Sequence, residues 1–257
     1  MAVTYDSVGP SASGVGGTAN PLSWTHTTVA ASTIVLVAIS CDITSTGAFA
    51  GVNCTLDGSN MTEIDGGSAN PTGASGANKH NEVIRVWYKT GITAGAHTIS
   101  YTDPGTISDF EGGSIAFAGA ASVGTPVGNG TTTATVNGTA ADSMVAGFAG
   151  AGNNITAQSG TSRFLNNYYG VSGDYLGNVA GQTTAGGGNI TLSFTTSASA
   201  NAQAMIAVEI IAIPTGSESS TVYSASASAL SGGTGSWANT GNANGAPDTV
   251  SAVWTSV

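Results

Sequence analysis

Short runs of Val, Ile, Thr and aromatic residues recur along the whole chain, separated by clusters of Gly, Ser and Asn. Such runs are typical of β-strands and the clusters of turns. No stretch of useful length repeats apolar residues at the i, i+3, i+4 and i+7 spacing of an amphipathic helix. The chain is therefore predicted to be all-β, with a jelly-roll-like antiparallel β-sandwich of about ten strands before Pro214.

Two predicted strands differ in how many faces they bury. The segment 32–40, STIVLVAIS, is almost continuously apolar, so we expect it at the centre of the fold, buried on both faces. The segment 97–102 alternates, with His97, Ile99 and Tyr101 on one face and hydroxyl side chains on the other. This pattern is typical of a half-buried antiparallel strand. Its expected partner is the preceding strand, 83–88.

Two glycine-containing segments are predicted to be turns. Asp57-Gly58 lies between the strand segments 52–56 and 61–64 and predicts a hairpin that pairs them. The segment 147–152, GFAGAG, superficially resembles a phosphate-binding loop, but NNIT at 153–156 stands where a helix would have to begin. We expect a turn there, and no cofactor.

A change of composition at Pro214 predicts a domain boundary. The segment 214–220, PTGSESS, is typical of a linker and directly follows an apolar strand. Residues 1–213 are then the β-sandwich domain, and 221–257 are a C-terminal β appendage or the start of a second β module. The C-terminal segment is too short to bury a core of its own.

Charged side chains are scarce. The chain has 4 Lys+Arg against 14 Asp+Glu, and charged residues make up 7% of it, against roughly 25% in an ordinary soluble domain. Nucleic acid is not expected as a partner, because a phosphate backbone requires clustered Lys and Arg. A membrane is not expected either, because the longest apolar run, near 206–213, is too short to span a bilayer.

The two cysteines, Cys41 and Cys54, flank the segment 42–53. They are candidates for a disulfide across paired strands, which would add about 3 kcal/mol of stability. Two small buried thiols are the alternative, and the sequence leaves both open.

Catalytic machinery is not recognisable. His26, His80 and His97 are the natural bases, and none lies in a catalytic motif. We expect His97 to be a sheet-face residue and His80 to be solvated. Glu209 interrupts an apolar strand, and an outward-facing position explains it. The sequence therefore predicts no catalytic residue and no enzyme activity.

Three acids, Asp103, Asp109 and Glu111, lie close in sequence around a Pro-Gly turn. Carboxylate oxygens are ligands that Ca²⁺ prefers, but no EF-hand or repeat spacing supports a site. We expect solvated turn acids there, and no metal.

Tyr168, Tyr169 and Tyr175 lie in a predicted loop beside Asn166 and Asn167. Aromatic rings beside amides suit sugar binding, and tyrosines are also enriched in protein interfaces. The three tyrosines are therefore predicted contacts to a glycan or to another subunit.

Several of these segments together resemble a known module. The succession of SWTH at 23–26, NMTEI at 60–64, VWY at 86–88 and GAHTI at 95–99 resembles a β-sandwich module of bacteriophage virion proteins, notably minor tail proteins of actinobacterial phages, and of some bacterial surface proteins. The resemblance covers roughly residues 1 to 213. GSWAN at 235–239 and NANGAPD at 242–248 are similar to the opening of a second module of phage tail and fibre proteins.

The resemblance implies a non-enzymatic structural protein of a virion, most simply a minor tail protein. Its implied partners are other virion proteins and copies of itself. A capsid decoration protein, or a carbohydrate-binding or adhesive surface module that contacts host-cell glycan, is the alternative. The N-terminal MAVTYD shows neither a basic region nor an apolar run, so no secretory signal is expected. This agrees with assembly in the host cytoplasm.

Overall fold

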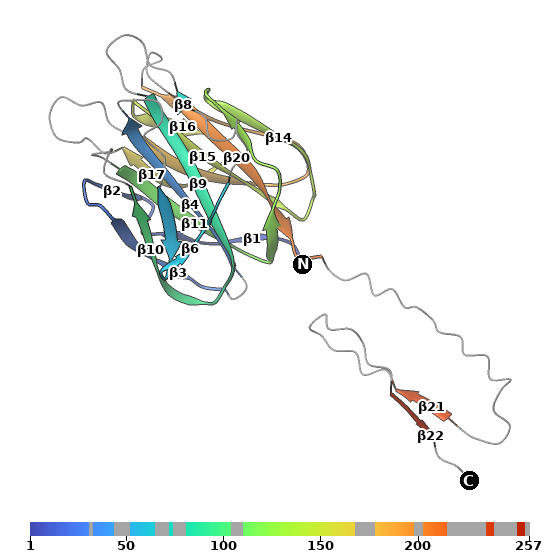
Figure 1. The fold of residues 1–257 in the computed structure, drawn as a ribbon. Coiled ribbons are helices and arrows are strands. Elements are labelled where there is room, and N and C mark those ends of the chain that lie inside the picture. The colour runs from blue at the N-terminus through green and yellow to red at the C-terminus, as the bar shows by residue number, and fades with distance from the viewer. Residues whose placement is uncertain are drawn as a thin grey trace. The chain divides into compact units, whose positions relative to one another are not determined.

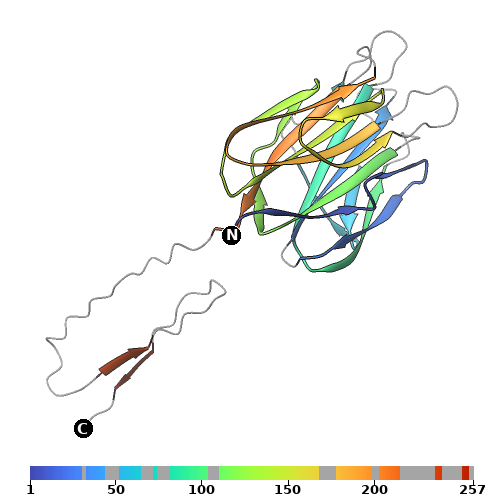
Figure 2. The same cartoon turned by 180° about the vertical axis from the view of Figure 1, so that it is seen from behind.

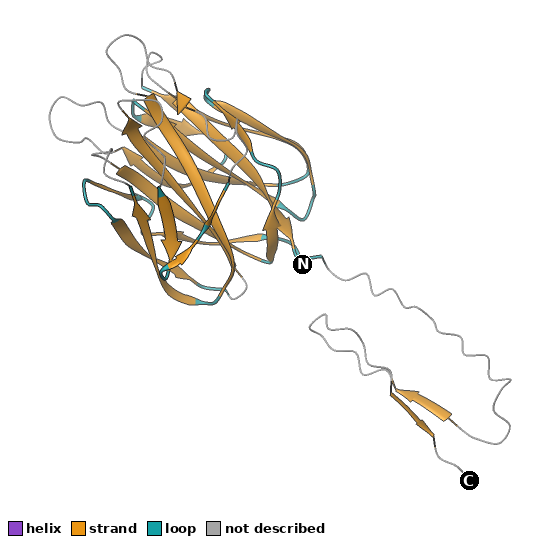
Figure 3. Ribbon diagram, in the orientation of Figure 1, coloured by secondary structure: helices purple, strands orange, loops and turns teal. Residues whose placement is uncertain are grey.

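The structure, a computed structural model, describes residues 1–30, 33–43, 52–64, 72–73, 81–103, 110–167, 178–197, 203–214, 235–238 and 251–254. Regular structure in these residues is entirely β, and Figure 3 shows strands and loops without a helix. Every strand pairing is antiparallel. The predicted all-β antiparallel sandwich architecture is confirmed.

The strands are β1 (Thr4–Gly9), β2 (Val15–Gly17), β3 (Leu22–Thr28), β4 (Thr33–Ile43), β5 (Asn53–Leu56), β6 (Ser59–Asn60), β7 (Thr62–Glu63), β8 (Thr72–Gly73), β9 (Asn81–Ile92), β10 (Gly95–Thr102), β11 (Phe110–Ala118), β12 (Ala120–Val123), β13 (Val127–Asn129), β14 (Thr133–Thr139), β15 (Met144–Ala151), β16 (Ile155–Gln158), β17 (Thr161–Asn167), β18 (Asn178–Ala185), β19 (Gly188–Thr196), β20 (Gln203–Ala212), β21 (Gly235–Ala238) and β22 (Ser251–Trp254).

Contacts divide the chain after Ile213. Met1–Ile213 is one compact unit, and Pro214–Val257 contains the antiparallel pair of β21 and β22. The two ends of the first unit meet, because the Met1 amino group donates a hydrogen bond to Ile213 O at 3.1 Å. Figure 1 shows the N-terminus beside the end of β20. Residues 215–220 of the predicted linker lie outside the described residues.

Residues 1–213 form two β-sandwiches that follow each other along the chain (Figures 1 and 2). In the first sandwich, the sheet β1-β11-β4-β9-β7, which we call inner sheet 1, packs on the sheet β3-β10-β5-β6, outer sheet 1. In the second, the sheet β12-β20-β15-β18-β17, inner sheet 2, packs on the sheet β14-β19-β16, outer sheet 2. The sequence predicted one sandwich here, and the structure contains two.

The two sandwiches have the same strand order. Read along the chain, β1, β3, β4, β5, β9, β10 and β11 take the places in the first that β12, β14, β15, β16, β18, β19 and β20 take in the second. The first strand of each sandwich also has a register shift in matching places. The shift lies between Tyr5 and Ser7 where β1 pairs with β11, and between Ala120 and Ser122 where β12 pairs with β20. The unit is therefore an internal structural duplication.

A threonine at the end of β3 and of β14 repeats the same contact. Thr28 pairs with Gly95, and Thr139 pairs with Gly188. Each threonine Oγ1 lies within hydrogen-bond distance of the carbonyl of its paired glycine, at 3.3 and 2.9 Å, and Thr28 Oγ1 also lies 2.7 Å from Thr93 O. These pairs give the register by which positions in the two sandwiches are compared.

The two inner sheets pack against each other and share the largest core. Its main members are Ile34, Leu36, Ile84, Val86, Ile115 and Phe117 from inner sheet 1, and Phe148, Phe164, Val179, Ile206, Val208 and Ile210 from inner sheet 2. The layers therefore run outer sheet 1, inner sheet 1, inner sheet 2, outer sheet 2. Residues 34–40 of β4 are buried throughout, which confirms the predicted central strand.

The strand that contains His97 pairs differently from the prediction. β10 lies between β3 and β5 in outer sheet 1, and β9 belongs to inner sheet 1. Burial explains the difference, because β9 places Val86 in the shared core and Trp87 in the core of the first sandwich, whereas β10 buries one face only. The predicted alternation of β10 is confirmed, with His97, Ile99 and Tyr101 buried.

The turn at Asp57-Gly58 forms as predicted, but the hairpin is shorter. Only Ser59 and Asn60 pair with β5. The chain then crosses to inner sheet 1, where Thr62 and Glu63 pair with β9.

The glycine-rich segment 147–152 is not a turn: residues up to Ala151 belong to the central strand β15. A Cβ atom at Gly150 would lie 2.9 Å from Ser40 Oγ in the opposite inner sheet. The ring of Phe164 similarly packs on Gly113 and Gly181, where added Cβ atoms would collide with it. A side chain at Gly113 or Gly150 would collide with the opposite inner sheet, and a side chain at Gly181 would collide with the ring of its cross-strand partner Phe164.

We predict that Gly181→Ala lowers the free energy of unfolding by about 1–3 kcal/mol, because the added methyl group displaces the Phe164 ring. Gly17→Ala is the matched control, since the nearest atom to its Cβ is 4.0 Å away. Its free energy of unfolding is expected to stay the same or rise slightly. Denaturant titration measures both, and equal effects would contradict the close packing.

Candidate functional site

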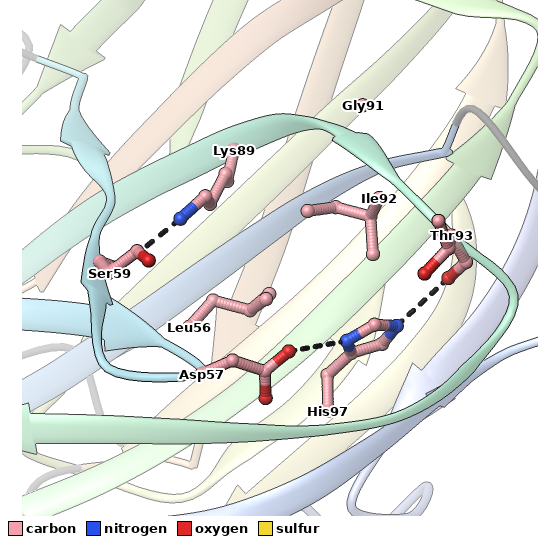
Figure 4. A pocket seen from close by; sticks show the side chains of 8 residues that line it. All are labelled: Leu56, Asp57, Ser59, Lys89, Gly91, Ile92, Thr93 and His97. Carbon is pink, nitrogen blue, oxygen red and sulfur yellow. Dashed lines mark hydrogen bonds and ion pairs between the residues drawn. The ribbon is translucent and has the colours of Figure 1, made fainter.

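A shallow pocket of about 200 Å³ lies where the β5–β6 turn meets the crossing from β9 to β10. It is lined by Leu56, Asp57, Ser59, Lys89, Gly91, Ile92, Thr93 and His97. In Figure 4, Lys89 stands at one end and the Asp57–His97 pair at the other, with Leu56 and Ile92 between them. Leu56 and Ile92 are buried, so the pocket has an apolar floor and charged ends.

Asp57 is held in place by its turn. Its φ of 51° and that of Gly58, 72°, are the left-handed values that a tight hairpin turn requires, and Asp-Gly suits them. The Asp57 N–H donates to Thr98 O, and the Thr98 N–H donates to Asp57 Oδ1, both at 2.8 Å. The carboxylate is therefore fixed against β10.

His97 uses both ring nitrogens. Nδ1 lies 2.7 Å from Asp57 Oδ2, and Nε2 lies 2.9 Å from Thr93 O. Both partners are acceptors, so the arrangement is satisfied when both nitrogens carry protons, that is, by the imidazolium. Burial lowers the pKa of His97, but the hydrogen bonds to Asp57 and Thr93 and the charge of Asp57 outweigh it and raise the pKa above 6.5. The hydrogen bonds from His97 and Thr98 in turn lower the pKa of Asp57.

The pocket suits binding better than catalysis. Both ring nitrogens of His97 are engaged by protein acceptors, so neither is free to exchange a proton with a ligand. The Asp57 oxygens each accept one hydrogen bond from the protein, which leaves acceptor capacity on both. Lys89 Nζ lies 3.5 Å from Ser59 O.

The second sandwich does not repeat this chemistry. Gly95 and Gly188 occupy matching positions in β10 and β19, because each pairs with the threonine that ends the neighbouring strand. His97 lies two residues after Gly95, and the residue two after Gly188 is Ile190. The fold therefore does not demand the charged groups of the pocket, and they are an addition of the first sandwich.

His26 lies in a separate polar network and is fully buried. Its Nδ1 is 2.6 Å from Ser114 Oγ, its Nε2 is 3.0 Å from Ser7 Oγ, and Ser7 donates to Asp6 Oδ2 at 2.9 Å. Burial lowers the pKa of His26 to about 4, so the ring is neutral at physiological pH.

This network contains the residue types of a catalytic triad, but its surroundings are closed. A Cβ atom on Gly9 would lie 2.6 Å from His26 Nδ1, so no space remains for a substrate beside the ring. The Asp6 carboxylate is occupied by the N–H groups of Val29 and Ala30, at 2.9 and 2.8 Å. The network joins β1, β3 and β11 and is structural.

The predicted glycan or interface contacts Tyr168, Tyr169 and Tyr175 lie outside the described residues, as does His80. Cys54 is a free thiol, buried with Sγ 3.6 Å from Met61 Sδ, and burial raises its pKa. Cys54 is therefore a small buried thiol in this structure, which was the alternative to the predicted disulfide. The side chain of Cys41 is outside the described residues.

Two of the acids weighed for calcium are buried, so the expectation of solvated turn acids is wrong for them. Glu111 is 0% exposed and Asp103 is 3% exposed. Glu111 lies on β11 inside inner sheet 1, between Gly16 and Ser40, rather than on a turn. Asp109 lies outside the described residues, and the residues that are described contain no group of three His, Cys, Asp or Glu able to hold a metal.

Glu209 has a structural contact that the sequence did not reveal. Its Oε1 accepts a hydrogen bond from the Ala140 N–H at 2.7 Å. The side chain braces the turn that follows β14, so its place in an apolar strand has a local explanation.

In the part of the chain that the structure describes, no helix has the length and apolar character needed to cross a membrane. No protein-family model, curated protein or solved structure matches the chain.

We predict that His26 makes the fold acid-sensitive. Its pKa is about 4 in the folded state and 6.5 ordinarily, so the unfolded chain takes up the proton first as the pH falls. The wild type should lose about 3 kcal/mol of stability between pH 6.5 and 4 that a His26→Gln variant does not lose. The difference between the two free energies of unfolding, measured against pH, isolates this effect. A difference that is constant with pH would contradict a neutral His26.

We predict the opposite dependence for the Asp57–His97 pair. Its stabilisation is complete below the ordinary His97 pKa of 6.5 and is lost as the pH rises through the raised pKa. Towards acid pH, the same stabilisation is fully present above the ordinary Asp57 pKa of 3.8, and it is lost as the pH falls through the lowered pKa of Asp57. A double-mutant cycle with Asp57→Asn and His97→Gln should give a coupling of about 0.5–1 kcal/mol at pH 5.5, because Asp57 is half exposed. The same coupling at pH 9 would contradict the imidazolium.

Proposed function

We propose that this chain is a non-enzymatic structural protein of a bacteriophage virion, most simply a minor tail protein, that works through contacts with neighbouring subunits. The observation that carries the proposal is a pair of uncharged, hydroxyl-rich faces on the two outer sheets of one four-layer unit. The resemblance of residues 1–213 to virion β-sandwich modules supplies the setting.

The face of outer sheet 1 is polar without charge. Its side chains are largely exposed and already bonded across strands, with Ser23 Oγ donating to Ser100 Oγ at 2.9 Å and Asn53 Nδ2 to Asn60 Oδ1 at 3.0 Å. The residues of this face are Ser23, Thr25, Thr27, Asn53, Thr55, Asn60, Thr98, Ser100 and Thr102.

The face of outer sheet 2 repeats these properties. Thr135 Oγ1 lies 2.8 Å from Thr191 Oγ1, and Thr156 Oγ1 lies 3.0 Å from Thr195 Oγ1. The residues of this face are Thr133, Thr135, Asn137, Thr156, Asn189, Thr191, Ser193 and Thr195.

Such faces suit contact with other subunits. The cores of protein interfaces are depleted in charged residues, because burying an unpaired charge is costly. Side chains that are already ordered by cross-strand hydrogen bonds lose less entropy when a partner binds. A unit with one such face on each side can contact two neighbours at once.

The histidines support a role without catalysis. Both described histidines, His26 and His97, have both ring nitrogens within hydrogen-bond distance of protein groups.

A capsid decoration protein would use the same faces. A carbohydrate-binding or adhesive module is the second candidate, and the pocket at Asp57 and Lys89 is the observation that favours it.

The proposal predicts a defined oligomer of the full chain. Thr25→Lys on the face of outer sheet 1, or Thr191→Lys on the face of outer sheet 2, should reduce the mass of the oligomer, because each substitution places a charge inside a contact between subunits. Val29→Lys is the matched control, since Val29 is 75% exposed and lies on neither face. Light scattering after size-exclusion chromatography, with negative-stain imaging, measures the result. A monomer at all concentrations, or equal effects of the three variants, would contradict subunit contact through these faces.

A further inference from the structure

We infer that the pocket between Lys89 and the Asp57–His97 pair binds one acidic sugar unit, such as a uronic acid. The sugar carboxylate would pair with Lys89, its hydroxyls would donate to Asp57, and one C–H face of its ring would lie on Leu56 and Ile92. The inference does not depend on the subunit contacts proposed above.

The size of the pocket limits the ligand. Its volume of about 200 Å³ is below the roughly 300–1,000 Å³ of pockets for drug-sized molecules. A single monosaccharide-sized group fits such a depression, as one unit of a longer glycan. The exposed rim at Gly91 and Thr93 leaves room for the rest of that glycan to continue into solvent.

Lys89 is the cation available to a ligand among the described Lys and Arg side chains. Arg85 Nε pairs with Glu63 Oε1 at 3.0 Å. Arg163 lies over the Tyr5 ring, 3.6 Å from its centroid, and donates to Thr183 Oγ1 at 2.7 Å. Lys89 makes a hydrogen bond to a backbone carbonyl at the long distance of 3.5 Å, and its charge also lowers the pKa of Asp57. Its ammonium group has three donors, so it can pair with a carboxylate in the pocket.

Asp57 is prepared to accept hydroxyl groups. Its side chain is 49% exposed, and each of its oxygens accepts one hydrogen bond from the protein. A carboxylate oxygen has a second lone pair for a further donor. Because the turn and His97 already hold the carboxylate, little entropy is lost when sugar hydroxyls bind to it.

The two ends of the pocket select against simpler ligands. A neutral sugar offers Lys89 only hydroxyl acceptors, so it loses the ion pair with a carboxylate. A small anion such as acetate pairs with Lys89 but supplies no hydroxyl donor to Asp57. A ligand that carries both a carboxylate and hydroxyls satisfies both ends.

The test uses the full chain with D-glucuronate and D-galacturonate as probes, and D-glucose and acetate as controls. Titration followed by NMR should show saturable shifts at the Thr98 amide and the His97 ring with a uronate. Lys89→Gln should weaken binding about tenfold or more, because a charge-assisted hydrogen bond is lost. Arg85→Gln removes the same charge outside the pocket and should leave the affinity unchanged.

The inference is overturned if the uronates do not bind, if glucose or acetate binds as tightly, or if Lys89→Gln binds like the wild type. Melting temperatures of the variants establish that each is folded. The oligomer mass of Lys89→Gln separates the two proposals, since a loss of uronate binding with unchanged mass leaves subunit contact intact.

Discussion

The packing of the two inner sheets against each other is the contact on which the rest of the unit depends. It buries one face of β4, β11, β15 and β20, whose other faces are covered by the outer sheets, and it joins the two sandwiches through one core. Glycine makes the approach possible where Phe164 lies on Gly113 and Gly181. With both inner sheets covered on each side, the outer sheets need to bury one face only, and their other faces are free to carry hydroxyl and amide groups.

The duplication shows which parts of the sandwich are general and which are local solutions. The turn after the threonine at the end of β3 and β14 is braced by a carboxylate in both halves. Asp6 on β1 supplies it in the first, by accepting the N–H groups of Val29 and Ala30, and Glu209 on β20 supplies it in the second, by accepting that of Ala140. The turn needs an acceptor, but the fold does not dictate which strand provides it. The His97 pocket is local in the same sense.

Burial per strand was readable from the sequence, and pairing was not. The apolar run in β4 predicted a central strand buried on both faces, and the alternation in β10 predicted a half-buried strand, because these patterns follow directly from how many faces are covered. The partner of β10 was missed, because adjacent strands in sequence can belong to different layers. The pocket was also missed, since Asp57, Lys89 and His97 meet only once β9 and β10 separate into different sheets. The Asp-Gly turn was the one local signal for it.

The hydrogen bond between the Met1 amino group and Ile213 O has a consequence for how the unit is connected. A body whose entry and exit lie side by side can be joined to other polypeptide at a single point. Force along a chain that enters and leaves at this point would pass beside the core of the unit rather than through it. Such a unit can be added to or removed from an assembly without changing the path of the chain that carries it.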